Sequence, residues 1–169
     1  MLFRSTSIGI TNNNLIMYAA AYGAGVYKST DGGHIWHITD STVINHFVRT
    51  LGLDPASPSV VFAGTGNGVY KTINGGTSWI PTSSGIPAGT SIRSMDIDPT
   101  NASMIYAGTD SSYLYKTTNA GTSWTQISNA NGFLSQDKFI RSITVDDMLP
   151  SVVYVGSDKI GRASCRERV

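Results

Sequence analysis

The stretch Gly25–Trp36 reads GVYKSTDGGHIW, and it returns as GVYKTINGGTSW over Gly68–Trp79 and as YLYKTTNAGTSW over Tyr113–Trp124. The three closing tryptophans are 43 and 45 residues apart. A recurrence at this spacing is typical of an array of similar supersecondary units. The array, rather than any single motif, therefore decides the fold.

Two further phrases repeat in the same register. An apolar phrase ends in Gly-Thr or Gly-Ser in three of its four copies and in Ala-Ala in the first, and an arginine-containing phrase ends in Asp-Pro or Asp-Asp. An array of helices with a similar period is the competing interpretation, but runs of four to seven residues rich in Val, Ile and aromatic residues are too short for helices and typical of strands. The apolar phrase occupies 15–21, 59–65, 103–109 and 151–157, and the arginine phrase occupies 48–55, 92–99 and 140–147.

Each unit is expected to contain four antiparallel strands. The arginine phrase forms the first, the apolar phrase the second, the Val-Tyr-Lys phrase the third, and the segment with the tryptophan the fourth. Asn74-Gly75-Gly76 and Asp31-Gly32-Gly33 are tight-turn sequences, because Gly and Asn tolerate positive φ. Four antiparallel strands in about 45 residues are one blade of a β-propeller. We therefore predict an all-β fold.

The length predicts an incomplete ring. Propellers close with about four to eight blades, whereas 169 residues hold about three and a half units of this period. The expected domain is a partial propeller over residues 1–158, with the ring not closed. Its blades are expected at about 1–42, 43–86 and 87–132, with a half-blade at 133–158, so the chain is interpreted as a fragment of a longer protein.

The last eleven residues, 159–169, do not continue the repeat. They read KIGRASCRERV and contain the single Cys and the single Glu of the chain. This sequence matches what a common sequencing adapter encodes, so we interpret residues 159–169 as a non-native, disordered tail. The alternative is a natural basic tail that binds an acidic partner.

Composition favours a secreted or cell-surface protein of bacterial type. Without the tail the net charge changes from +1 to −2, because the tail holds four of the twelve basic residues and one of the eleven acidic ones. No basic stripe remains for nucleic acid, no apolar run is long enough for a membrane span, and a Cys-free core needs no disulfide framework. No signal peptide is present in this fragment.

The repeated hairpin resembles the Asp-box, also called the bacterial neuraminidase repeat. The match is Ser29-x-Asp31-x-Gly33-x-x-Trp36, and the two later copies carry Asn in the Asp position. Such boxes occur in propellers of sialidases, xyloglucanase-type glycoside hydrolases, sortilin-like receptors and a photosystem-assembly factor. The accompanying phrases look most similar to the xyloglucanase and sortilin-like arrays.

The box residues are expected to be structural, because a feature present in every blade is a folding device and a ligand site normally breaks a repeat. The carboxyl or amide would pin the turn amides, the glycine would supply backbone freedom, and the tryptophan would cover the turn. In the families it resembles, the box lies away from the active cleft. The twelve structural residues are Ser29, Asp31, Gly33, Trp36, Thr72, Asn74, Gly76, Trp79, Thr117, Asn119, Gly121 and Trp124.

Other recurring polar residues also favour structural roles. Asp54, Asp98 and Asp146 are expected to cap turns, and Lys28, Lys71 and Lys116 to lie on a strand face. Arg49, Arg93 and Arg141 lie on the strand that could be innermost; their equal spacing favours structure, while an arginine cluster that binds a carboxylate is the alternative. His34, His37 and His46 lack the convergent ligands of a metal site, so no metal and no cofactor are predicted.

Residues that break the repeat are better candidates for function. Asp96 replaces Gly52 of the preceding unit, Asp110 replaces Gly66, and an insert at 129–134 lengthens one connection. In xyloglucanase-like enzymes two aspartates face each other across a cleft between two propellers. We assign no catalytic residue, and Asp96 is the candidate for one half of such a pair.

Two functions remain open. The first is a non-catalytic propeller module of a larger protein that binds polysaccharide or protein and contacts the missing blades of its parent chain. The alternative is a fragment of a xyloglucanase-like or sialidase-like glycoside hydrolase.

Overall fold

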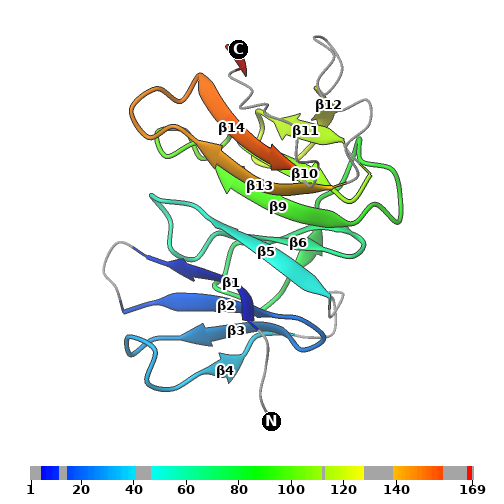
Figure 1. The fold of residues 1–169 in the computed structure, drawn as a ribbon. Coiled ribbons are helices and arrows are strands. Elements are labelled where there is room, and N and C mark those ends of the chain that lie inside the picture. Colours follow the sequence, from blue (N-terminus) through cyan, green and yellow to red (C-terminus); the bar gives the residue numbers. More distant parts are fainter. Residues whose placement is uncertain are drawn as a thin grey trace.

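The computed structural model describes residues 5–11, 15–40, 47–111, 113–127, 139–157 and 167–168. These residues form strands, turns and loops without a helix, which confirms the all-β prediction. The strands make four separate antiparallel sheets that follow one another along the chain as the blades of an open arc (Figure 1). The partial, unclosed propeller predicted from the repeat is therefore the observed fold.

Consecutive strands are hydrogen-bonded neighbours within each sheet, as expected for a meander. Blade 1 contains β1 (Ser5–Ile10), β2 (Met17–Ala21), β3 (Gly25–Ser29) and β4 (His37–Ile38). Blade 2 contains β5 (Val48–Leu53), β6 (Val61–Thr65), β7 (Gly68–Thr72) and β8 (Ile80–Pro81). Blade 3 contains β9 (Ile92–Ile97), β10 (Ile105–Thr109), β11 (Leu114–Thr117) and β12 (Thr125–Gln126). Blade 4 contains β13 (Ile140–Val145), β14 (Val152–Ser157) and β15 (Glu167–Arg168).

The fourth strand does not include the tryptophan, which was expected to lie in it. In blades 1 to 3 it spans two residues and begins directly after the tryptophan, as with β4 after Trp36. The tryptophan thus belongs to the hairpin turn, and its ring is free to fold back over the neighbouring blade. In blade 4 the third strand is β15, which lies in the segment interpreted as a tail and pairs with Val152 and Val153 of β14. The other tail residues lie outside the described residues.

The first strand of each blade is the innermost one, and the innermost strands of adjacent blades run in the same direction. Between blades 1 and 2, the Thr6 hydroxyl donates to the Val48 carbonyl (3.0 Å) and the Leu51 amide donates to the Ser7 hydroxyl (3.2 Å). Between blades 3 and 4, the Ser94 hydroxyl donates to the Ile140 carbonyl (3.1 Å). The arginine strand is therefore innermost, as the sequence suggested.

Each innermost strand carries an irregularity at its second residue. The pairing register shifts between the first and third residues of β1, β5, β9 and β13, so that the residue between them is bulged. Bulges re-aim a side chain relative to a regular strand. The bulged residue is Arg49, Arg93 or Arg141 in blades 2 to 4 and Thr6 in blade 1.

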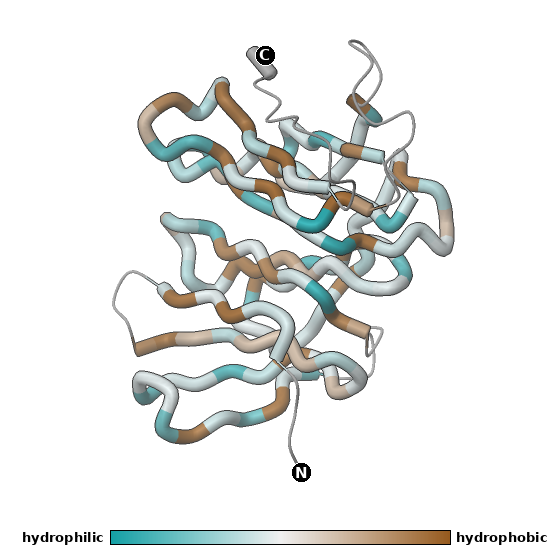
Figure 2. The backbone as a smooth tube through the Cα atoms, viewed as in Figure 1, coloured by the Kyte–Doolittle hydropathy of each residue, from teal (hydrophilic) through white to brown (hydrophobic). Residues whose placement is uncertain are grey.

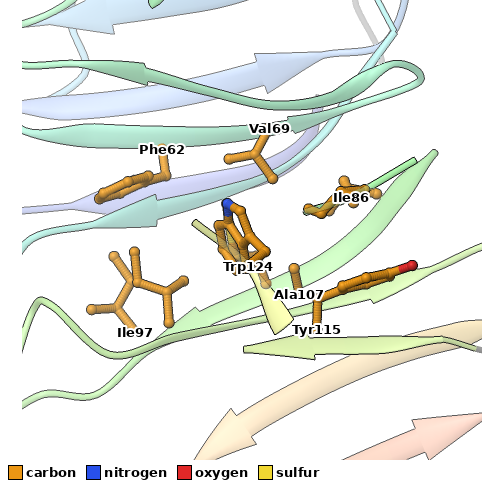
Figure 3. Close-up of a cluster of buried hydrophobic side chains, with 10 residues drawn as sticks. Phe62, Val69, Ile86, Ile97, Ala107, Tyr115 and Trp124 are labelled. Atoms are coloured by element: carbon orange, nitrogen blue, oxygen red, sulfur yellow. The ribbon is translucent and has the colours of Figure 1, made fainter. Parts of the chain in front are cut away.

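The core consists of the seams between blades. In the seam between blades 2 and 3, Trp124 lies between Phe62 and Val69 on one side and Ile97, Ala107 and Tyr115 on the other (Figure 3). The seam between blades 1 and 2 is built the same way, with Trp79 packed against Tyr18. A buried Trp removes a large apolar surface from water and dominates local packing. Each of these two tryptophans thus packs its own blade against the preceding one.

The Gly of the apolar phrase permits the close approach of blades. A Cβ on Gly64 would lie 2.7 Å from Cγ2 of Ile92 in the next blade and 2.5 Å from Cγ2 of Thr50. Gly108 meets Ile140 of its following blade in the same way. In blade 1 the equivalent residue is Ala20, and its strand partner is Ser7, which is smaller than Thr50, the partner of Gly64. The repeat therefore encodes inter-blade contact distance as well as strand structure.

Candidate functional site

The two ends of the innermost strands carry different chemistry. The bulged arginines lie near the start of these strands, together with the β2–β3, β6–β7 and β10–β11 turns. Because strands alternate in direction within a blade, the box turns between the third and fourth strands lie at the opposite end. We call the first the arginine end and the second the box end.

Two arginines from different blades meet one carboxylate at the arginine end. Arg93 Nε contacts Asp110 Oδ1, and Arg49 Nη2 lies 3.7 Å from Asp110 Oδ2. Burial alone would raise the pKa of Asp110, but the hydrogen bond and charge of Arg93, with the charge of Arg49, outweigh burial and lower it. Asp110 is therefore ionised at neutral pH and holds blades 2 and 3 together across the seam.

Aromatic rings flank these arginines. The Arg49 guanidinium lies 5.6 Å from the centroid of Tyr22, and Arg93 and Arg141 lie 4.9 and 5.1 Å from the centroid of Phe139. Such cation–π contacts orient the guanidinium planes.

Two of the rings at this end are open to solvent. Tyr22 and Phe47 remain 48% and 47% exposed, and their centroids are 5.2 Å apart. Tyr22 and Phe47 also form an isolated antiparallel bridge, which joins blade 1 to blade 2. The arginine end thus presents a half-exposed aromatic pair beside a guanidinium group.

Asp96 lies toward the box end of β9, where its carboxylate links the innermost strands β9 and β13 by a hydrogen bond. Oδ1 accepts the Ile97 amide (2.9 Å) and Oδ2 accepts the Val145 amide of β13 (2.8 Å). Burial raises the pKa of Asp96, and the charge of Asp147 raises it further. The two amide bonds lower this pKa, but the net shift is upward. The carboxylate borders an open hollow of about 260 Å³, which Leu53 and Asp147 also line.

The predicted box residues form one repeated hydrogen-bond network at the box end. In the second copy the Thr72 hydroxyl donates to Asn74 Oδ1 (2.9 Å) and accepts the Gly76 amide (2.9 Å), while Asn74 Oδ1 also accepts the Ser78 amide (3.0 Å). The third copy repeats these bonds around Asn119. The hydroxyl is as central as the amide, which the sequence reasoning did not specify.

The first copy explains why Asp can replace Asn. Asp31 Oδ1 accepts the amides of His34 and Ile35, both at 3.0 Å, and the Ser29 hydroxyl donates to it at 2.7 Å. These bonds, the Ile35 amide first, lower the pKa of Asp31. Where the box has Asn, its amide group also donates to a serine, Ser78 in the second copy, whereas the first copy has Ile35 at that position.

The lysines of the repeat have a role that sequence reasoning missed. Lys28 Nζ donates to the Gly75 carbonyl (3.3 Å) and Lys71 Nζ donates to the Ala120 carbonyl (3.1 Å), in each case at the box turn of the next blade. The available sequence signal was the similar distance from each lysine to the box turn of the next unit, 47 and 49 residues. These bonds join adjacent blades at the box end.

The remaining predicted positions are the aspartates that follow the innermost strands, and the histidines. Asp54, Asp98 and Asp146 each accept two amides of the following turn, as predicted. His34 Nδ1 lies 2.6 Å from the Asp31 carbonyl. Over the described residues no group of three or more His, Cys, Asp or Glu could hold a metal ion. His46 and the insert at 129–134 lie outside the described residues.

Comparison with solved structures places the chain among propellers. An ancestral GH74 enzyme superposes with a TM-score of 0.79 at 26% identity, over 93% of this chain and 22% of that chain. The GH74 enzyme of Niastella koreensis gives 0.55 at 16% identity, over 90% of this chain and 35% of that chain. YCF48 from Cyanidioschyzon merolae gives 0.68 at 11% identity, over 90% of this chain and 48% of that chain.

The chain spans about a fifth of the length of the first of these structures. No protein-family model matches it, and no curated protein matches it. Among the described residues no helix is long and apolar enough to cross a membrane. The comparisons support a propeller fold for this chain, and two of the three structures are GH74 enzymes.

Proposed function

We propose that this chain is a non-catalytic segment of a propeller built from Asp-box repeats, and that its arginine end binds glycan. The parent would be a larger secreted or cell-surface bacterial protein, as the Cys-free, weakly charged core suggests. The structural role assigned to the box residues is part of the same proposal.

The observation that carries the proposal is how the two non-repeated aspartates are used. Both oxygens of Asp96 accept backbone amides, and both oxygens of Asp110 face arginines. Glycoside hydrolysis needs one carboxyl group that can donate a proton and a second that can attack or activate water. Carboxylates engaged in joining blades are poorly placed for either task.

The exposed pair Tyr22 and Phe47 supports glycan as the ligand. Both rings are about half exposed although they are large and apolar, and Arg49 beside them supplies hydrogen-bond donors. An aromatic face can cover the apolar face of a sugar ring while nearby polar groups bond its hydroxyls. The likeness to GH74 enzymes favours polysaccharide over protein as the partner class.

A binding assay tests this proposal directly. We expect Tyr22→Ala and Phe47→Ala each to weaken binding of the full chain to soluble xyloglucan about tenfold in calorimetry or affinity electrophoresis. Ile80→Ala is the matched control, because Ile80 is similarly exposed but lies on the outermost strand of blade 2. Equal binding by all three variants and the original chain, or binding to a protein and to no glycan, would reject the glycan site.

A second candidate function is a glycoside hydrolase fragment. The raised pKa of Asp96 and the hollow beside it are what a general acid requires. Hydrolysis of xyloglucan or of a sialyl reporter by the complete parent protein, lost in Asp96→Asn and retained in Asp147→Asn, would establish this candidate. It would also refute the non-catalytic proposal.

A further inference from the structure

A hollow at the box end lies between blade 1 and the box turn of blade 2. Its volume is about 290 Å³, and Gly75, Gly76 and Thr77 of the box turn belong to its lining. Blade 1 supplies the rest of the lining from β3, from β4 and from the segments that directly follow these two strands. Two hydrogen bonds between the blades border the hollow: Lys28 Nζ donates to the Gly75 carbonyl (3.3 Å), and the Asp40 amide donates to the Gly76 carbonyl (3.0 Å). The hollow is therefore built into a seam whose two sides are bonded together.

Two of the side chains that line this hollow break the repeat. In the pairing of the third strand with the fourth, His37 lies opposite the repeat lysine, where blade 2 has Ile80. Asp40 occupies the position at which the second unit has Ser83. Figure 2 shows hydrophilic positions on both β3 and β4, with a hydrophobic position beside the one on β4. Residues that depart from the repeat are the better candidates for function, because the structural positions are the shared ones.

The two ionic side chains of the hollow have opposite charges. An anion that approaches the Lys28 ammonium group also meets the Asp40 carboxylate, and a cation meets the reverse arrangement. An ammonium group has three N–H donors, and Lys28 makes one hydrogen bond among the described residues, to the Gly75 carbonyl. A carboxylate has about four acceptor sites on its two oxygens. The pair therefore offers donors and acceptors to a ligand without net charge.

The other side chains suit a ligand that carries several hydroxyl groups. Thr30 and Thr77 contribute hydroxyls, and His37 contributes ring nitrogens that donate or accept. Ile38, which is 53% exposed, supplies an apolar surface at the same place. A sugar ring combines hydroxyls at its rim with an apolar C–H face, and ligand sites generally pair a few placed polar groups with apolar surface.

We propose that the hollow between blades 1 and 2 binds one neutral sugar unit. Ligand sites have volumes of about 300–1,000 Å³, so a hollow of about 290 Å³ suits a single ring rather than an oligosaccharide. The hollow lies at the box end, whereas the bridged pair Tyr22 and Phe47 lies at the arginine end. This site is therefore a second one, and it does not depend on the function proposed above.

Titration of the isotopically labelled full chain with methyl glycosides tests the site, with the amide signals of Gly76 and Thr77 as the readout. The probes are the methyl glycosides of glucose, galactose, mannose and xylose. We expect at least one of them to shift both signals saturably, with a dissociation constant of about 1 mM, as for a small ligand in an open site. Methyl glucuronide, which adds a carboxylate, should bind at least about fivefold more weakly than the best neutral probe. No saturable shift with any neutral probe, or glucuronide binding that is as tight or tighter, would overturn the proposal.

Two variants take their new residues from the second unit, so each introduces a side chain that this fold already accepts at the equivalent position. His37→Ile and Asp40→Ser should each raise the dissociation constant at least about fivefold, because each removes polar groups that bond sugar hydroxyls. Ile80→His, the reverse exchange at the equivalent position of blade 2, is the matched control and should leave the affinity unchanged. The same spectra show that the variants are folded. An unchanged affinity in either variant, or an equal loss in the control, would refute the site.

Discussion

Gly64→Ala tests whether inter-blade spacing is set by the Gly of the apolar phrase. The new methyl would lie 2.5 Å from Thr50 Cγ2 and 2.7 Å from Ile92 Cγ2, closer than real side chains approach. Overpacking of this kind costs about 1–3 kcal/mol. Replacing Gly within a strand returns about 0.5–1 kcal/mol of backbone entropy. The expected net loss in unfolding free energy is about 1–2 kcal/mol, or roughly 2–8 °C in melting temperature for a chain of this size.

Urea and thermal denaturation of Gly64→Ala measure this loss, and Thr50→Ser supplies the rescue. Removing Thr50 Cγ2 takes away the nearest clash and reproduces the pairing of Ala20 with Ser7 in blade 1. The double variant should therefore recover part of the lost stability in a double-mutant cycle. An unchanged melting temperature for Gly64→Ala, or the absence of coupling to Thr50→Ser, would refute the reasoning.

Three further predictions concern the boxes and the arginine end. Ala120→Gly should raise the unfolding free energy by about 0.5–1 kcal/mol in denaturant titration, because Ala120 has a left-handed φ of 52° where the other two boxes carry Gly. The control Ala102→Gly should give no such stabilisation, because Ala102 does not have a positive φ. Asn74→Ala should cost about 1–2 kcal/mol through the lost bonds to Thr72 and Ser78, and Asn74→Asp should cost less, since the first box carries Asp; equal costs in thermal scans would contradict the network. Asp110→Asn should cost about 1 kcal/mol of unfolding free energy at pH 7. Because folding lowers the pKa of Asp110, this cost should be full above the unfolded pKa and should vanish as the pH falls through the folded pKa. A cost that does not change with pH would disprove the ion-pair role.

Local features of the fold were predictable from the sequence. The strands, the box turns and the aspartate caps each depend on residues within a few positions of one another, so one copy of the repeat contains the necessary information. The bond from the Ser78 amide to Asn74 Oδ1 is of this kind. The two-residue length of the fourth strand was not predicted, because it depends on where the tryptophan turns toward the neighbouring blade.

Contacts between blades were not predictable in the same way. Arg49 and Arg93 meet Asp110 only because a bulge re-aims each arginine and the innermost strands lie side by side. The Asp96 bond to the Val145 amide also joins residues that are 49 positions apart. Asp96 was interpreted as a candidate for one half of a catalytic pair because it breaks the repeat, and its bond to the β13 strand could not be predicted from that pattern.

The lysine bonds between blades have a consequence for biosynthesis. The box turn of blade 2 receives Lys28 and the box turn of blade 3 receives Lys71, so each hairpin is completed by a residue already synthesised. Trp124 likewise donates to the Thr82 carbonyl of the preceding blade. As the polypeptide leaves the ribosome, the sheets of blades 2 and 3 can therefore each dock on a blade that has already been synthesised.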